Sequence, residues 1–243
     1  MGNLLSLHPQ IDGLRAYTKE LSGLLNCPRT FVAGQSNWTR CVYAIGLAHL
    51  TSRHRILIPC TLLEKRAVLN IWFTADFHLG HKNIIQYCNR PFHTVEEMNR
   101  EILERLNSRV KANDILYFLG DFCIGPKARA AELRQQIRCK RIFALAGNHD
   151  KETRKLTEEF TWLNDLAEVS LNGQRIVLCH YAMRVWNQSS RGAWHLYGHS
   201  HGKLQAPDTS LSMDVGVDTH DFRPWHFDEI RERMKAKSAP ATG

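Results

Sequence analysis

Residues 72–83 read WFTADFHLGHKN, an apolar run that changes abruptly into a polar one. The apolar part suits a buried strand, yet Asp76, His78 and His81 follow it within a few residues. Burying such groups without partners costs about 2–7 kcal/mol for a neutral polar group and more for a charge. The rest of the chain must therefore supply whatever compensates them.

The composition describes an ordinary globular protein. The chain has 243 residues, enough for one large α/β domain or for a domain with an appendage. No apolar run approaches the roughly 20 residues that a membrane span requires. The seven cysteines form no C-x-x-C pair. We therefore expect a cytoplasmic protein with no membrane span and no disulfide framework.

The N-terminal residues differ in charge from the rest. Residues 1–67 carry eight Lys/Arg and three Asp/Glu, so most of the net charge of +8 lies there. Nucleic-acid binding by the remainder is only weakly indicated. We interpret residues 1–67 as a poorly structured or accessory segment that targets or tethers the protein to a partner or membrane. The alternative is that translation starts near Val68.

The rest of the chain has the pattern of one domain at residues 68–237, followed by a short tail at 238–243. The sequence predicts, in order, a strand at 69–75, a helix that starts at the capping box Thr94–Glu97 and runs to 110, a strand at 115–119, a helix at 127–138 and a strand at 141–146. Such a β-α-β-α-β order predicts a layered α/β fold with largely parallel pairing in its first half.

The second half is richer in strands. The sequence predicts a hairpin of 166–171 and 174–179 around Asn172-Gly173, short strands at 194–197 and 212–217, and a closing helix at 226–236.

Five of the predicted strands end in Asp, Asn or His, often after a Gly that lets the backbone turn closely. These residues are Asp76, His78, Asp121, Asn148, His149, His180, His199 and His201. Ligand sites of open α/β sheets lie at the carboxyl edge of the strands, so we expect the side chains to converge there. Residues two apart on an extended chain project to the same side, as we expect for Asp76 with His78 and for His199 with His201.

The residue types indicate a metal centre. Carboxylate, imidazole and amide ligands suit Mn, Fe, Zn or Ni. Seven of these eight residues would already be too many ligands for one ion, and that number suits two divalent ions that share a bridging carboxylate. Two ions roughly 3.5–4 Å apart can activate a bridging water and stabilise an in-line phosphoryl displacement.

In this order the motifs resemble those of the calcineurin-like metallophosphoesterases: Asp76-x-His78, Gly120-Asp121, Gly147-Asn148-His149-Asp150, His180 and Gly198-His199-x-His201. The segments LGHKNIIQYCNRPF and VGVDTHDFRPWHFDEI resemble a small bacterial and phage subgroup of that family. The resemblance implies a four-layer α/β/β/α sandwich of two mixed sheets with flanking helices.

The resemblance also implies a role for each motif residue. One ion would be held by Asp76, His78 and His201, and the other by Asn148, His180 and His199, with Asp121 as the bridging ligand. His149 would assist catalysis by protonating the leaving alkoxide, a task that suits an imidazole with a pKa near 6.5.

The chain departs from the family pattern after Asp121. There the family often has a second Asp that orients the catalytic His, whereas this chain has Phe122 and Cys123. Asp150, next to His149, is an alternative orienting group.

The sequence allows more than one role for several other residues. Arg90 and His81 either contact the substrate phosphate or are ordinary loop residues, and Asn148 is a candidate donor to a phosphate oxygen. We interpret Asp214 and Asp218 as turn residues or neighbours of the ligands.

The function we expect is dimetal-dependent hydrolysis of a phosphodiester or phosphomonoester by a metal-bridged hydroxide. The substrate would be a nucleotide or a small molecule, and a nuclease or cyclic-nucleotide phosphodiesterase competes with a phosphatase. The alternative is a catalytically silent, metal-bearing scaffold that binds proteins, as in the retromer subunit that resembles these enzymes. The sequence does not indicate an oligomeric state.

Overall fold

The structure of the protein is a computed structural model that describes residues 69–204 and 210–238. The predictions for residues 1–67, including the alternative start near Val68, concern residues outside these ranges. In the described part, no helix has the length and apolar character needed to cross a bilayer. The cytoplasmic location stays a prediction.

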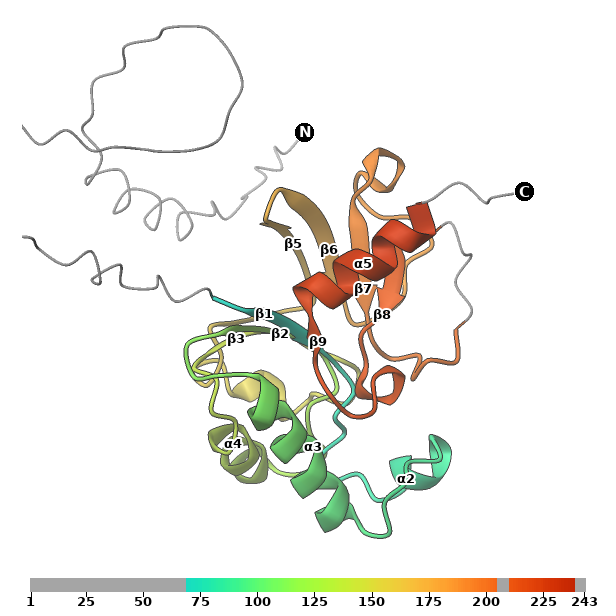
Figure 1. Ribbon diagram of the computed structural model, residues 1–243. Helices are drawn as coiled ribbons and strands as arrows, with labels where there is room; N and C mark the ends of the chain where they lie inside the picture. The colour runs from blue at the N-terminus through green and yellow to red at the C-terminus, as the bar shows by residue number, and fades with distance from the viewer. Residues whose placement is uncertain (1–68, 205–209, 239–243) are drawn as a thin grey trace, which may run out of the picture. The chain divides into compact units, whose positions relative to one another are not determined.

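The strands of the described residues form two mixed sheets (Figure 1). The first sheet has the order β4-β3-β2-β1-β9, with parallel pairing except between β1 and β9. Its strands are β1 (Ile71–Thr74), β2 (Ile115–Leu119), β3 (Arg141–Leu145), β4 (Trp162–Asn164) and β9 (Trp225–His226). The second has the order β5-β6-β7-β8, in which only the β5–β6 pair is antiparallel. Its strands are β5 (Leu166–Leu171), β6 (Gln174–Cys179), β7 (Trp194–Tyr197) and β8 (Ser212–Asp214).

Alternating side chains of the first sheet enter two cores, because successive residues of a strand face opposite sides. Trp72 of β1 packs in a core with α3, whereas its neighbour Phe73 packs in a core with β6, β7 and α5. Figure 1 shows α3 and α4 on the side of the first sheet that faces away from the second. The helices are α2 (Ile84–Tyr87), α3 (Val95–Arg109), α4 (Lys127–Gln135) and α5 (Phe227–Ser238). The predicted fold class, two mixed sheets packed face to face with flanking helices, is confirmed.

Most predicted elements occur close to their expected bounds. The capping box is confirmed, since the Thr94 side chain accepts a hydrogen bond from the Glu97 backbone N–H at 3.1 Å. Helix α4 ends at Gln135 rather than at 138, because the Arg134 guanidinium draws the following carbonyls of Ile137 and Cys139 toward itself. The short elements α2, β4 and β9 were not predicted.

Strand β8 also ends early, at Asp214 instead of at 217. There the Asp214 carboxylate accepts a hydrogen bond from the Gly216 N–H at 2.8 Å and closes a turn. This turn carries the chain past the carboxyl end of β1, where Ala75 and Gly216 pair in a single bridge. The two sheets therefore meet at the strand end that the sequence marked for a site.

Candidate metal centre

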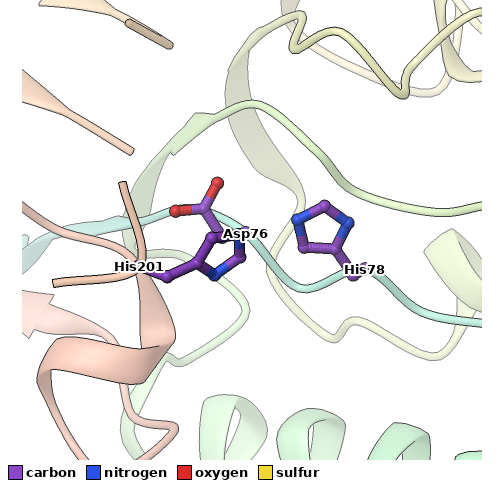
Figure 2. Close-up of side chains that lie close together, drawn as sticks. All are labelled: Asp76, His78 and His201. Atoms are coloured by element: carbon purple, nitrogen blue, oxygen red, sulfur yellow. The ribbon is translucent and has the colours of Figure 1, made fainter. Parts of the chain in front are cut away.

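A first ligand group consists of Asp76, His78 and His201. One ligand atom of each residue lies within 4.8 Å of the other two. Figure 2 shows the three side chains converging from two chain segments, the loop after β1 and the loop after β7. The structure therefore brings together residues that are far apart in the sequence, at the edge where the sheets meet.

A second ligand group consists of Asp121, His180 and His199, whose ligand atoms also lie within 4.8 Å of one another. The side-chain oxygen of Asn148 lies 3.2 Å from Nε2 of His180, so this amide adjoins the group. The second group is the more open of the two, because Asn148 and His199 are exposed.

Asp121 lies between the two groups. Its Oδ2 atom is 3.4 Å from Nε2 of His78 and 3.3 Å from Nε2 of His180. The carboxylate is buried, with 1% of the residue exposed. One carboxylate oxygen therefore faces an imidazole of each group, the position that a bridging ligand requires.

The backbone at the ligands differs from the expected extended chain. Asp76, His78, Asp121, His199 and His201 have φ between 48° and 65°, the left-handed region that non-glycine residues rarely adopt. The argument that Asp76 and His78, or His199 and His201, face one side because the chain is extended is therefore wrong. His199 and His201 belong to different groups. Such backbone strain persists only where the surroundings impose it, and it concentrates at functional sites.

Glycines make room for the two carboxylates. A Cβ atom on Gly147 would lie closer than 3.0 Å to Oδ1 of Asp121, and one on Gly216 equally close to Oδ2 of Asp76. These glycines thus let the carboxylates lie close against the backbone, in addition to letting the backbone turn. Gly216 was not singled out from the sequence, where it falls within the predicted strand 212–217 that carries no predicted ligand.

Within the described residues, the first group leaves buried polar atoms without hydrogen-bond partners. These atoms are Oδ2 of Asp76 and both ring nitrogens of His78. Leaving such atoms unpaired is costly, and a bound cation would compensate them. A divalent metal ion therefore fits the residues present.

Two imidazoles are oriented as metal ligands usually are. His180 donates its Nδ1–H to the Leu119 carbonyl at 2.8 Å, and His201 donates its Nδ1–H to Asp218 at 2.7 Å. In each ring the Nε2 lone pair is left to face the site. A carbonyl or carboxylate behind the imidazole fixes the tautomer in this way in metal proteins.

The pKa values of the clustered side chains reflect their burial and their contacts with one another. Burial raises the pKa of Asp76 to about 7 and lowers the pKa of His78 to about 3. Burial alone would raise the pKa of Asp121, but the hydrogen bond and charge of His180 and the charge of His78 lower it to about 2. Burial alone would lower the pKa values of His180 and His201. The hydrogen bond of His180 to Asp121 and that of His201 to Asp218 outweigh burial and raise both pKa values.

His149 is exposed and lies near the first group. Its ring centroid is 5.2 Å from that of His78, and its backbone N–H donates to Oδ1 of Asp121 at 2.9 Å. Asp150 does not orient its ring, contrary to the alternative raised by the sequence. Both oxygens of Asp150 accept hydrogen bonds from backbone N–H groups of Gly147, Asp121 and Phe122.

His81 faces the site, whereas Arg90 lies behind it. The His81 ring lies 5.7 Å from His78 and 6.0 Å from His149, and its buried Nδ1 has no hydrogen-bond partner among residues 69–204 and 210–238. The Arg90 guanidinium is fully buried, and all its N–H groups are used within the protein. This geometry argues against the predicted phosphate contact of Arg90.

One exposed aromatic residue beside the site escaped the sequence reasoning. Tyr181 is 46% exposed, and its ring lies 4.9 Å from His180 and 4.8 Å from His199. Its position directly after a predicted ligand was the available signal.

The comparisons with known proteins show the family of the chain. The family model of the calcineurin-like phosphoesterases matches residues 69–208. An uncharacterized protein of Methanocaldococcus jannaschii is 31% identical over 166 residues, which cover 66% of this chain and 88% of the relative. The gene 66 protein of Mycobacterium phage D29 is 25% identical over 197 residues, which cover 68% of this chain and 96% of the phage protein.

A solved structure shares the fold. The crystal structure of a protein of unknown function from Aquifex aeolicus superposes with a TM-score of 0.54 at 22% identity, covering 68% of this chain and 98% of that chain. The family match spans more than half of the 243 residues. The chain therefore belongs to the calcineurin-like phosphoesterase family and is a metal-dependent hydrolase of phosphoester bonds.

Proposed function

We propose that the protein hydrolyses its phosphoester with two divalent metal ions, one in each ligand group. The single observation that carries the proposal is the placement of Asp121, whose Oδ2 lies within 3.4 Å of an imidazole nitrogen of each group. Two ions held there would supply an activated water molecule and would withdraw charge from the phosphoryl oxygens. Mn, Fe, Zn and Ni all suit these ligands.

We assign the remaining chemistry to side chains at the rim. His149 would protonate the leaving alkoxide, because the residue is exposed to solvent and its ring adjoins His78. Asn148, beside the second group, would donate its amide to a phosphoryl oxygen. His81 would contact the phosphate through its ring, whose Nδ1 has no hydrogen-bond partner in the described part of the chain.

The substrate would be a phosphodiester or a phosphomonoester of a nucleotide or another small molecule. The exposed Tyr181 ring beside the second group favours an ester whose alcohol carries a flat aromatic group, since such rings stack. The alternative expected from the sequence was a catalytically silent, metal-bearing scaffold. The complete set of ligands and the exposed His149 favour the enzyme.

The proposal is tested by assaying the Mn²⁺-loaded protein on bis-p-nitrophenyl phosphate and p-nitrophenyl phosphate. Turnover should require metal, disappear in Asp121→Asn, and fall by at least 10²-fold in His149→Ala. His93→Ala, which changes an exposed histidine at the start of α3, should retain turnover. Metal binding with unchanged turnover in Asp121→Asn would contradict the proposed two-metal mechanism.

A further inference from the structure

A buried guanidinium connects two strand-end loops of the first ligand group. Arg90 donates to both oxygens of Asp218, each at 2.8 Å, and to the backbone carbonyls of Asp76 at 2.7 Å and Phe77 at 2.9 Å. Its remaining N–H points to the sulfur of Met98 at 3.4 Å. The side chain is 0% exposed. Every donor of Arg90 is thus used to hold protein groups.

Asp218 links Arg90 to the imidazole of His201, a residue of the first ligand group. Its Oδ2 accepts the Nδ1–H of His201 at 2.7 Å as well as a hydrogen bond from Arg90. The carboxylate therefore fixes the His201 ring, while Arg90 fixes the carboxylate. One buried ion pair holds both Asp76, through its carbonyl, and His201, through its ring.

We propose that Arg90 and Asp218 are positioning residues for the first metal ion, an inference that rests on the proposed two-metal function. Asp76 has a φ of 60° and His78 a φ of 50°, conformations that need outside support. Arg90 supplies that support by binding the two carbonyls of the turn between them. Partners behind metal ligands set affinity in this way, and their loss costs about 10–100-fold.

The effect should be specific to the first group. In the described residues, no hydrogen bond or ion pair joins Arg90 or Asp218 to Asp121, His180 or His199. The His180 ring is held instead by the Leu119 carbonyl. Removing the Arg90 side chain should therefore weaken the binding of the ion in the first group and leave the binding of the other ion unchanged.

The chain contains a matched control in Arg134. This arginine is also buried, with 8% of the residue exposed, and donates to the carbonyls of Glu159, Ile137 and Cys139. Its guanidinium lies 5.7 Å from the Phe160 ring, as that of Arg90 lies 5.7 Å from Phe222. A purely structural role for Arg90 predicts that substitutions at the two arginines behave alike.

The test measures Mn²⁺ bound per full-length chain by equilibrium dialysis and metal analysis, beside the melting temperature. The variants are Arg90→Gln, Asp218→Asn, Arg134→Gln and His199→Ala, with the double variant of Arg90→Gln and His199→Ala. At the lowest Mn²⁺ concentration that saturates the wild type with two ions, Arg90→Gln and His199→Ala should each bind one. The double variant should bind none. Arg134→Gln should melt earlier but still bind two.

The proposal is overturned if Arg90→Gln binds two ions with wild-type affinity, or if Arg134→Gln also loses an ion. It is equally overturned if the double variant still binds one ion, because both substitutions would then affect the same site. If Arg90→Gln does not fold, Asp218→Asn decides by the same criteria. A wild type that binds fewer than two ions refutes the two-metal function itself, which separates that failure from a failure of the positioning role.

Discussion

Asp150 accepts a hydrogen bond from the backbone N–H of Asp121 at 2.6 Å, so one buried carboxylate holds the residue that lies between the ligand groups. The same carboxylate accepts the N–H groups of Gly147 at 2.8 Å and Phe122 at 2.9 Å. It thereby ties the carboxyl end of β2 to that of β3. Asp150 is a structural support for the site rather than a partner of His149.

Asp150→Ala should therefore lower stability strongly. The change leaves three buried backbone N–H groups unpaired, each worth about 1–3 kcal/mol, so the free energy of unfolding should fall by about 3 kcal/mol or more. Urea denaturation monitored by circular dichroism measures this. His149→Ala, one residue earlier but exposed, should change stability by less than about 0.5 kcal/mol. Equal effects of the two substitutions would contradict the assigned role of Asp150.

Gly147→Ala should disable the site by a clash, because the added methyl group would meet the Asp121 carboxylate. We expect Mn²⁺-dependent turnover to fall by at least tenfold. Gly192→Ala is the contrasting control: Gly192 has a φ of +83°, but no described residue apart from its chain neighbours lies within 4 Å of its Cβ position. It should lose about 1 kcal/mol of stability through backbone strain and retain its activity. A fully active Gly147→Ala would argue against the tight packing of Asp121.

Metal binding should release more protons at pH 6 than at pH 8. Burial raises the pKa of Asp76 to about 7, so this carboxyl is largely protonated at pH 6 and largely ionised at pH 8 in the metal-free protein. The metal requires the carboxylate, and the proton must therefore leave at the lower pH. His78, with its pKa lowered to about 3, is neutral at both values and releases none. Calorimetry in buffers of different ionisation enthalpy counts the protons, and equal release at both pH values would refute the expectation.

Tyr181→Ala should weaken the binding of aryl phosphoesters while leaving the chemical step intact. The predicted result is a KM for bis-p-nitrophenyl phosphate that rises about 5–10-fold with kcat within twofold, since an aromatic contact is worth about 1 kcal/mol. Tyr181→Phe keeps the ring and should retain the wild-type KM. Leu69→Ala is the exposure-matched control, because Leu69 is also 46% exposed but precedes the amino end of β1. A Tyr181→Ala variant with unchanged KM would remove Tyr181 from the substrate site.

The sequence predicted those features that local signals specify. The Thr94–Glu97 capping box marked the start of α3, and Asn172-Gly173 marked the hairpin turn between β5 and β6. Asp, Asn and His residues after apolar runs marked the edge at which the site lies. These signals span only a few residues, so a single sequence suffices to detect them.

The features that escaped prediction arise from tertiary contacts. Arg90 and Asp218 are 128 positions apart, and no local pattern pairs them. The left-handed backbone at Asp76 and His78 likewise depends on bonds to the neighbouring β2 loop, where Asp76 N–H reaches the Gly120 carbonyl. An extended chain was the natural expectation from alternating residues, and these contacts overrule it.

The placement of Asp121 between two ligand groups is tested most directly by anomalous diffraction from crystals of the Mn²⁺-loaded protein. The account predicts two anomalous peaks about 3.5–4 Å apart, with Asp121 touching both, the first also bound by Asp76, His78 and His201. Asp121→Asn should reduce the occupancy of both peaks. A single peak, or two peaks without Asp121 between them, would contradict the two-metal account.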